Sequence, residues 1–175
     1  MSSRNRAITL IVIQCLLVST IAAKYLYERA TRPRVWVRAG QYDPDLPMRG
    51  RYLALSPEVD VCGLQPQHEN HFQDTFYKTY RVQLSVRDGK LVAEDARDRL
   101  PLGDSPMATA SNRIPCERAQ LSAIDFFIPE HAQSPFPLKP RQELWVEVTV
   151  PPSGPPRPIQ LALSDNGKWQ VLQFE

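Results

Sequence analysis

The chain has 175 residues, with 21 basic and 19 acidic side chains and a formal net charge of +2 at pH 7. Two of the basic residues, Arg4 and Arg6, precede the first apolar segment, so the remainder carries 19 charges of each sign. A surface balanced in this way gives no electrostatic reason to bind nucleic acid, and we expect no nucleic-acid partner. The 17 prolines all follow the apolar segment and leave little room there for long helices.

The apolar segment, residues 7–27, predicts a transmembrane helix. Its first seventeen residues contain no charge, proline or glycine, and as a helix they rise roughly 25 Å. Lys24 can direct its ammonium group outward, and Tyr25 and Tyr27 suit the headgroup region, which extends the span to roughly 30 Å. We expect an uncleaved anchor in the lipid bilayer. A cleaved signal peptide is the alternative, but residues 20–22 are a poor version of the small-x-small cleavage pattern.

The orientation of this anchor is predicted from two opposing signals. Lys24 and the four arginines that follow it favour a cytoplasmic C-terminal side if Lys and Arg alone are counted. The short tail before the apolar segment resembles instead that of a signal-anchor, and the later cysteines suit an oxidising compartment. We therefore predict a cytoplasmic tail of residues 1–6, an anchor of 7–27, a stem of 28–33 and an extracytoplasmic domain of 34–175.

Two cysteines, Cys62 and Cys116, lie beyond the anchor in turn-rich, polar surroundings. An even pair in such a setting predicts a disulfide that closes a loop of about 55 residues and adds about 4 kcal/mol on the chain-entropy estimate. Two free buried thiols are the alternative.

Short alternating strands follow the anchor in chain order. Residues 34–38 alternate polar and apolar side chains, which predicts a half-buried strand. A turn-rich crossing separates them from a second alternating run, residues 50–55, which we expect to stop at Ser56 and Pro57.

The middle of the chain is predicted to mix loops and strands. Residues 61–73 are polar and irregular, and residues 97–115 resemble a loop. Residues 121–128 predict a short strand, and residues 142–150 place Leu144 and alternate aliphatic residues on one face.

Two hairpins are predicted from their turns. Asp88-Gly89 joins residues 76–87 to residues 90–93, and Asn166-Gly167 lies in the connection between residues 158–163 and 168–174. Both dipeptides favour two-residue hairpin turns, because both turn positions need positive φ. About seven short strands and no further helix predict an all-β domain, either an antiparallel barrel or a sandwich.

One motif lies where the second strand begins. The run Gly50-Arg51-Tyr52-x-x-Leu55 resembles the Gly-Asp-Tyr-x-x-Leu-x-Tyr signature of the GDYXXLXY family of bacterial membrane-anchored proteins. Arg51 replaces the aspartate of that signature, and Pro57 stands where its last tyrosine would be.

The context of the motif is similar to that family as well. An N-terminal membrane helix precedes it, and residues 126–130 resemble an aromatic-aromatic-x-Pro-Glu segment found later in such chains. The resemblance implies a bacterial inner-membrane protein with a periplasmic domain that associates with a multi-spanning membrane protein. It implies no reaction.

We predict that the residues around these motifs bind the partner. The candidates are Arg49, Gly50, Arg51, Tyr52, Phe126, Phe127 and Glu130. Arg49 and Arg51 would project to one face and meet an acidic partner surface or a lipid headgroup; a solvated strand edge protected by charge is the alternative. Tyr52 and Leu55 should lie on opposite faces of their strand, one in the core and one exposed.

An enzyme is the competing hypothesis. His68 and His71 are three residues apart, which on a helix would place both on one side for a metal, as in a periplasmic hydrolase. Their surroundings are polar and contain no third ligand at a suitable spacing, so we predict no metal site, no cofactor and no catalytic residue.

Overall fold

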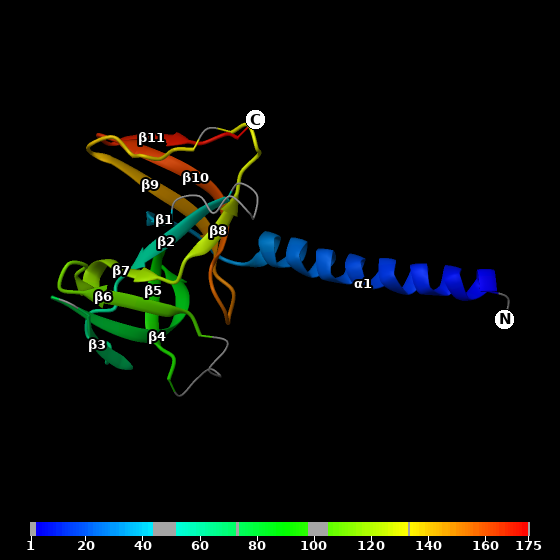
Figure 1. Cartoon of the computed structure of the whole chain (residues 1–175), viewed down its shortest axis with the longest axis horizontal. Helices are drawn as coiled ribbons and strands as arrows, with labels where there is room; N and C mark the ends of the chain where they lie inside the picture. The colour runs from blue at the N-terminus through cyan, green and yellow to red at the C-terminus, as the bar shows by residue number, and fades with distance from the viewer. Residues whose placement is uncertain (1–2, 44–51, 73, 98–104, 133, 175) are drawn as a thin grey trace. The chain divides into compact units, whose positions relative to one another are not determined.

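The computed structural model describes residues 3–43, 52–72, 74–97, 105–132 and 134–174. The chain divides into two compact units, Met1–Arg32 and Pro33–Glu175, the first helical and the second built of strands (Figure 1). The elements are α1 (Ser3–Thr31), β1 (Arg34–Asp43), β2 (Tyr52–Val59), β3 (His68–Phe72), β4 (Thr75–Arg87), β5 (Lys90–Asp95), β6 (Met107–Ser111), the 3-10 turn η1 (Cys116–Arg118), β7 (Ala119–Leu121), β8 (Ile124–Phe127), β9 (Gln142–Thr149), β10 (Arg157–Asp165) and β11 (Lys168–Val171).

The helix α1 extends the predicted anchor at both ends. Its span Asn5–Glu28 has 24 residues, and an 18-residue window within it has a mean hydropathy of 2.0 and no buried residue. The hydroxyl groups of Thr9 and Thr20 donate hydrogen bonds to carbonyls four residues earlier, so the helix satisfies these polar groups itself. By length and composition α1 can cross a membrane, as an anchor and equally as a signal sequence.

The second unit confirms the all-β prediction and corrects its details. Every strand pair is antiparallel, and the order is β11-β10-β9-β1-β2-β7-β6-β4-β3, with β5 added to β4 and β8 added to β2. The described residues thus form eleven strands rather than about seven, in a sandwich-like arrangement that does not close into a barrel. Figure 1 shows β9, β10 and β11 on one side of this unit and β3, β4 and β6 on the other.

The strand β2 connects the two sides, and it continues through Pro57, where the sequence predicted its end. Residues 52–55 pair with β8, and residues 58–59 pair with β7. Pro57 lies between these two partners on one edge and opposite Ala39 of β1 on the other. The missing N–H of a proline is tolerated in a strand where pairing on one side is interrupted.

Two strands, β3 and β6, were missed by the sequence analysis because neither has an alternation of large apolar side chains. All five residues of β3 are exposed, so this strand is held by backbone pairing with β4. In β6 the inward residues are Ala108 and Ala110, which are buried but small. The predicted strand at 121–128 is divided between β7 and β8, which pair with different parts of β2.

Both predicted hairpins and their turns are confirmed. Asp88 and Gly89 have φ of 52° and 71°, and Asn166 and Gly167 have φ of 49° and 83°. Arg87 pairs with Lys90 across the first turn, and Asp165 pairs with Lys168 across the second. Positive φ at both positions matches the twist of the flanking strands, which fixes the register of each hairpin.

The core lies between the two sides of the sandwich. Its fully buried side chains include Leu55 of β2, Val82 of β4, Leu121 of β7, Val146 of β9 and Leu161 of β10. Burial of each such side chain stabilises the fold by about 1.5–3 kcal/mol. The core therefore joins strands far apart in the sequence and holds both faces of the sandwich in place.

Candidate functional site

Two of the predicted partner-binding residues, Tyr52 and Phe127, lie directly opposite each other. Tyr52 begins β2 and Phe127 ends β8, and their ring centroids are 6.3 Å apart. Phe127 is 73% exposed, whereas Leu55 on the opposite face of β2 is fully buried. Tyr52 and Leu55 lie on opposite faces as predicted, with Leu55 in the core, but Tyr52 is half-buried rather than exposed. In the described part of the chain β8 pairs with β2 alone, so this aromatic pair lies at a sheet edge.

The neighbouring candidate, Phe126, has a different role because it points to the other face of β8. It pairs with Leu53, packs against the core and has its ring centroid 5.7 Å from that of Phe174. Glu130 is exposed three residues beyond β8. The remaining candidates, Arg49, Gly50 and Arg51, lie outside the described residues.

An open hollow of about 580 Å³ includes Phe174, whose ring lies against that of Phe126. Its lining mixes apolar and polar side chains: His131, Ala132, Ser134, Pro135, Leu163, Leu172, Gln173 and Phe174. Among the described lining residues, His131 is the one ionisable side chain. A shallow, mixed surface of this kind can receive a side chain of a partner protein, and its described residues include no acid–base pair for catalysis.

A second aromatic group was missed by the sequence analysis. All three tryptophans of the chain lie together on the outer face of the layer formed by β1, β9, β10 and β11. The ring centroid of Trp169 is 5.0 Å from that of Trp36, at an interplanar angle of 87°, and 5.6 Å from that of Trp145. Aromatic pairs favour such edge and tilted contacts.

The sequence did contain a signal for this group, because each tryptophan is out of phase with the core residues of its strand. Trp36 lies between the buried Val35 and Val37, and Trp145 lies between the buried Leu144 and Val146. A large apolar side chain on the polar phase of a half-buried strand points to the outer face of the sheet. We call the outward residues Trp36, Trp145, Trp169, Ala162 and Val171 the tryptophan face.

A series of ion pairs crosses the same outer face next to the tryptophans. Arg118 of η1 donates two hydrogen bonds to the carboxylate of Glu58, at 2.7 and 2.8 Å. Arg38 approaches Glu58 to 3.9 Å and Glu143 to 2.9 Å, and the indole N–H of Trp145 donates to Glu143 at 3.3 Å. The hydrogen bonds from Arg118 to Glu58 raise the pKa of the Arg118 guanidinium above its ordinary value.

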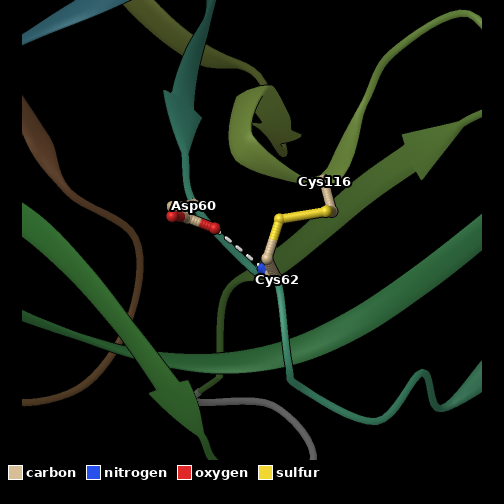
Figure 2. Close-up of a disulfide and its surroundings, with 3 residues drawn as sticks. All are labelled: Asp60, Cys62 and Cys116. Carbon is tan, nitrogen blue, oxygen red and sulfur yellow. Dashed lines mark hydrogen bonds between the residues drawn. A yellow bond between two sulfur atoms is a disulfide. The ribbon is translucent and has the colours of Figure 1, made fainter.

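The predicted disulfide is present and replaces the alternative of two free thiols. Cys62 and Cys116 are bonded, with their Cα atoms 5.0 Å apart, and Figure 2 shows the bond beside the carboxylate of Asp60. That carboxylate accepts a hydrogen bond from the backbone N–H of Cys62 at 2.8 Å, and the N–H of Val61 donates to the carbonyl of Cys116 at 3.0 Å. The bond ties the end of β2 to the turn before β7.

The histidines of the competing enzyme hypothesis lie on a strand instead of a helix. His68 and His71 are three residues apart in β3, so their side chains point to opposite faces. The imidazole of His71 lies against Phe76, with ring centroids 4.3 Å apart. Within the described residues, the one group of three metal-ligand side chains within reach of each other is Cys62, Cys116 and Glu117, and its two sulfur atoms are bonded together.

Comparison of the chain with family models, with curated proteins and with solved structures found no match.

Proposed function

We propose that this protein is a single-pass protein of a bacterial inner membrane whose periplasmic β domain binds a multi-spanning membrane protein as an accessory module. The observation that carries the proposal is the Tyr52–Phe127 pair at a sheet edge, in which an exposed phenylalanine lies opposite a half-buried tyrosine, in a chain with an apolar helix near its N-terminus. Its resemblance to the GDYXXLXY family supports the same partner class.

The aromatic pair has the properties of a binding anchor. Exposing a ring such as that of Phe127 forfeits the free energy of its burial, about 1.5–3 kcal/mol. Aromatic side chains are enriched at the centres of protein interfaces, where a partner removes them from water. The hollow lined by Phe174 lies beside Phe126, on the other face of β8, and offers a second place for a partner side chain.

The disulfide supports an extracytoplasmic location for the β domain. Disulfides such as Cys62–Cys116 persist in the periplasm and other oxidising compartments, whereas cytosolic thiols are kept reduced. We infer that the N-terminal tail is cytoplasmic and that α1 remains attached as the anchor. Reporter fusions test this arrangement: an alkaline phosphatase joined after Phe174 should be active, and the unprocessed chain should resist alkaline extraction from membranes. An inactive fusion or a soluble chain would contradict it.

Photocrosslinking in native membranes tests the binding surface. A photoreactive phenylalanine analogue in place of Phe127 should capture one multi-spanning membrane protein, because the side chain is exposed at the proposed interface. The matched control carries the same analogue at Lys90, an exposed position beside the turn between β4 and β5. Capture of lipid alone at position 127, or identical products from the two positions, would falsify the proposal.

A further inference from the structure

The strand β3 ends the strand order of the β domain without the features that usually protect such an edge. In the part of the chain that the structure describes, β3 pairs with β4 alone, and all five of its residues are exposed (Figure 1). It contains no proline and no lysine, and its register with β4 has no bulge. An edge strand accepts a further strand unless charges, prolines or bulges prevent the pairing.

The charge on β3 is balanced within its own sheet. Glu69 is the one acidic residue of β3, and Lys78 lies opposite it on β4 with its ammonium group 3.1 Å from the carboxylate. The strand β11, at the other end of the strand order, has only four residues and begins with Lys168. Short length and an edge lysine both discourage pairing. Of the two ends of the strand order, β3 is therefore the one open to another strand.

Aromatic side chains surround this open edge. Phe72 is 66% exposed and Phe76 is 59% exposed, and the imidazole of His71 lies against Phe76 with ring centroids 4.3 Å apart. Because His71 and Phe72 are adjacent in a strand, these rings lie on both faces of the β3–β4 ribbon. Side chains at opposite positions of neighbouring strands contact each other, so a strand added to β3 would cover part of these rings.

The sequence of β3 is complementary to itself. When two β3 strands pair antiparallel with Asn70 opposite its counterpart, all five residues of each strand are paired. Glu69 then faces His71 of the second copy, and His68 faces Phe72 of the second copy. An imidazole N–H donates to a carboxylate, two rings pack together, and no like charges oppose each other. A two-fold axis passes through the Asn70 pair, so each contact occurs twice.

We propose that β3 pairs antiparallel with β3 of a second copy of this chain, so that the two β domains share one continuous sheet. This dimer goes beyond the proposed accessory role and does not depend on it, because Tyr52 and Phe127 belong to β2 and β8 instead. The dimer carries two copies of that aromatic pair.

Cysteine cross-linking of the full chain in membranes tests the dimer. Cys15→Ser removes the free cysteine and leaves the Cys62–Cys116 bond. In this background Asn70→Cys places two thiols directly across the axis, where opposed Cα atoms are about 4.5–5.5 Å apart and within disulfide range. Under mild oxidation with copper phenanthroline we expect about five times more disulfide-linked dimer than from Lys90→Cys, an exposed position on β5.

The register is tested by moving the cysteine along β3. In the proposed pairing His68 is about 13 Å from its own counterpart, so His68→Cys should cross-link no more than Lys90→Cys. His68→Cys combined with Phe72→Cys should restore the dimer, because these two positions oppose each other. Equal yields at positions 68 and 70, or a yield at 70 no higher than at 90, would overturn the proposal. A cross-link from position 70 to a different protein would overturn the second copy as the occupant.

A charge exchange tests the same contact without moving the cysteine. In the Asn70→Cys chain, Glu69→Lys removes the acceptor for His71 of the second copy and adds an edge lysine, so the dimer yield should fall several-fold. Adding His71→Glu restores opposite charges across the pair and should recover the dimer. Glu94→Lys makes the same reversal on β5 and should leave the yield unchanged. An unchanged yield with Glu69→Lys, or no recovery in the exchanged chain, would contradict the proposed pairing.

Discussion

The two faces of the layer formed by β1 and β9 differ in what they contribute to the molecule. The inner face presents Val35 and Val37 of β1 beside Leu144 and Val146 of β9, and all four are at most 5% exposed. The outer face of the same strands presents arginines, glutamates and tryptophans that form ion pairs and ring contacts. Alternate residues of the same strand therefore contribute to the core and to the outer surface.

This difference teaches where stability and binding are to be found in the chain. Each inner side chain is surrounded by core atoms, so its truncation leaves a cavity whose cost adds to the lost burial. Substitution of an outer side chain changes the free energy of unfolding little, because that side chain is already in contact with water in the folded protein. We therefore expect stability and binding to respond to different residues, and five measurements test this, from the largest expected effect to the smallest.

The largest effect is expected from removal of the disulfide, which tests whether packing of the inner face alone keeps the β domain folded. Replacement of both Cys62 and Cys116 by serine should lower the free energy of unfolding by about 4 kcal/mol, because the unfolded chain regains the entropy of a loop of about 55 residues. Urea denaturation of the full chain in detergent measures this change. Cys15→Ser removes the free cysteine of α1 and should leave the transition of the β domain in place.

Truncation on the inner face should have the next largest effect. Leu144→Ala should lower the free energy of unfolding by about 3 kcal/mol, since Leu144 is 1% exposed within the core. The matched outer variant is Val171→Ala, in which a partly exposed aliphatic residue is shortened, and we expect a change below about 0.5 kcal/mol. Equal losses for the two variants would remove the distinction between the faces.

The ion pairs of the outer face should contribute a smaller amount. Glu58→Gln removes the charge that accepts two hydrogen bonds from Arg118, and we expect a loss of about 1 kcal/mol in the free energy of unfolding. Glu94→Gln breaks the more exposed pair with Arg87 and should cost less than about 0.5 kcal/mol. If Glu58→Gln lowers the free energy of unfolding no more than Glu94→Gln does, the ion pairs of the outer face have no special role in stability.

The pH dependence of this pair follows from the raised pKa of Arg118. A base whose pKa is raised on folding stabilises the native state at any pH below its unfolded pKa, and this contribution is lost as the pH rises through the folded pKa. An arginine loses its proton only in strong alkali. We therefore expect the share of Arg118 in the unfolding free energy to be constant between neutral and moderately alkaline pH, as urea titrations across that range would measure.

The smallest effect on stability should accompany a large effect on binding. Phe127→Ser should change the free energy of unfolding by less than about 0.5 kcal/mol, because the ring is largely exposed. With a photoreactive analogue at Tyr52, the same substitution should reduce capture of the membrane partner several-fold, because it removes the opposing aromatic anchor. Unchanged capture would place the binding surface elsewhere.

The features that the sequence predicted correctly are local ones. The apolar run at residues 7–27 and the turns at Asp88-Gly89 and Asn166-Gly167 depend on neighbouring residues alone, and the structure contains all three. The Cys62–Cys116 bond joins distant residues, but the even cysteine count beyond the anchor restricted the choice. Tyr52 and Phe127 were both proposed as partner-binding residues without any indication that they are opposite each other.

The features that the sequence did not predict depend on contacts between distant strands. The strand β3 has no alternating apolar residues, so only its pairing with β4 identifies it as a strand. Pro57 is accommodated in β2 because β7 and β8 pair with β2 on either side of it. Trp36 is more than a hundred residues from Trp145 and Trp169, and no periodic pattern links the three.

The amino-acid sequence by itself determined the apolar helix, the all-β class and the two tight hairpins, because hydrophobic periodicity and turn conformation are properties of adjacent residues. Only the tertiary structure decided the strand order, the open sandwich and the gathering of Trp36, Trp145 and Trp169 on one outer face. The physical reason is that sheet register is set by burial of a shared core, and this register also determines which outward side chains become neighbours.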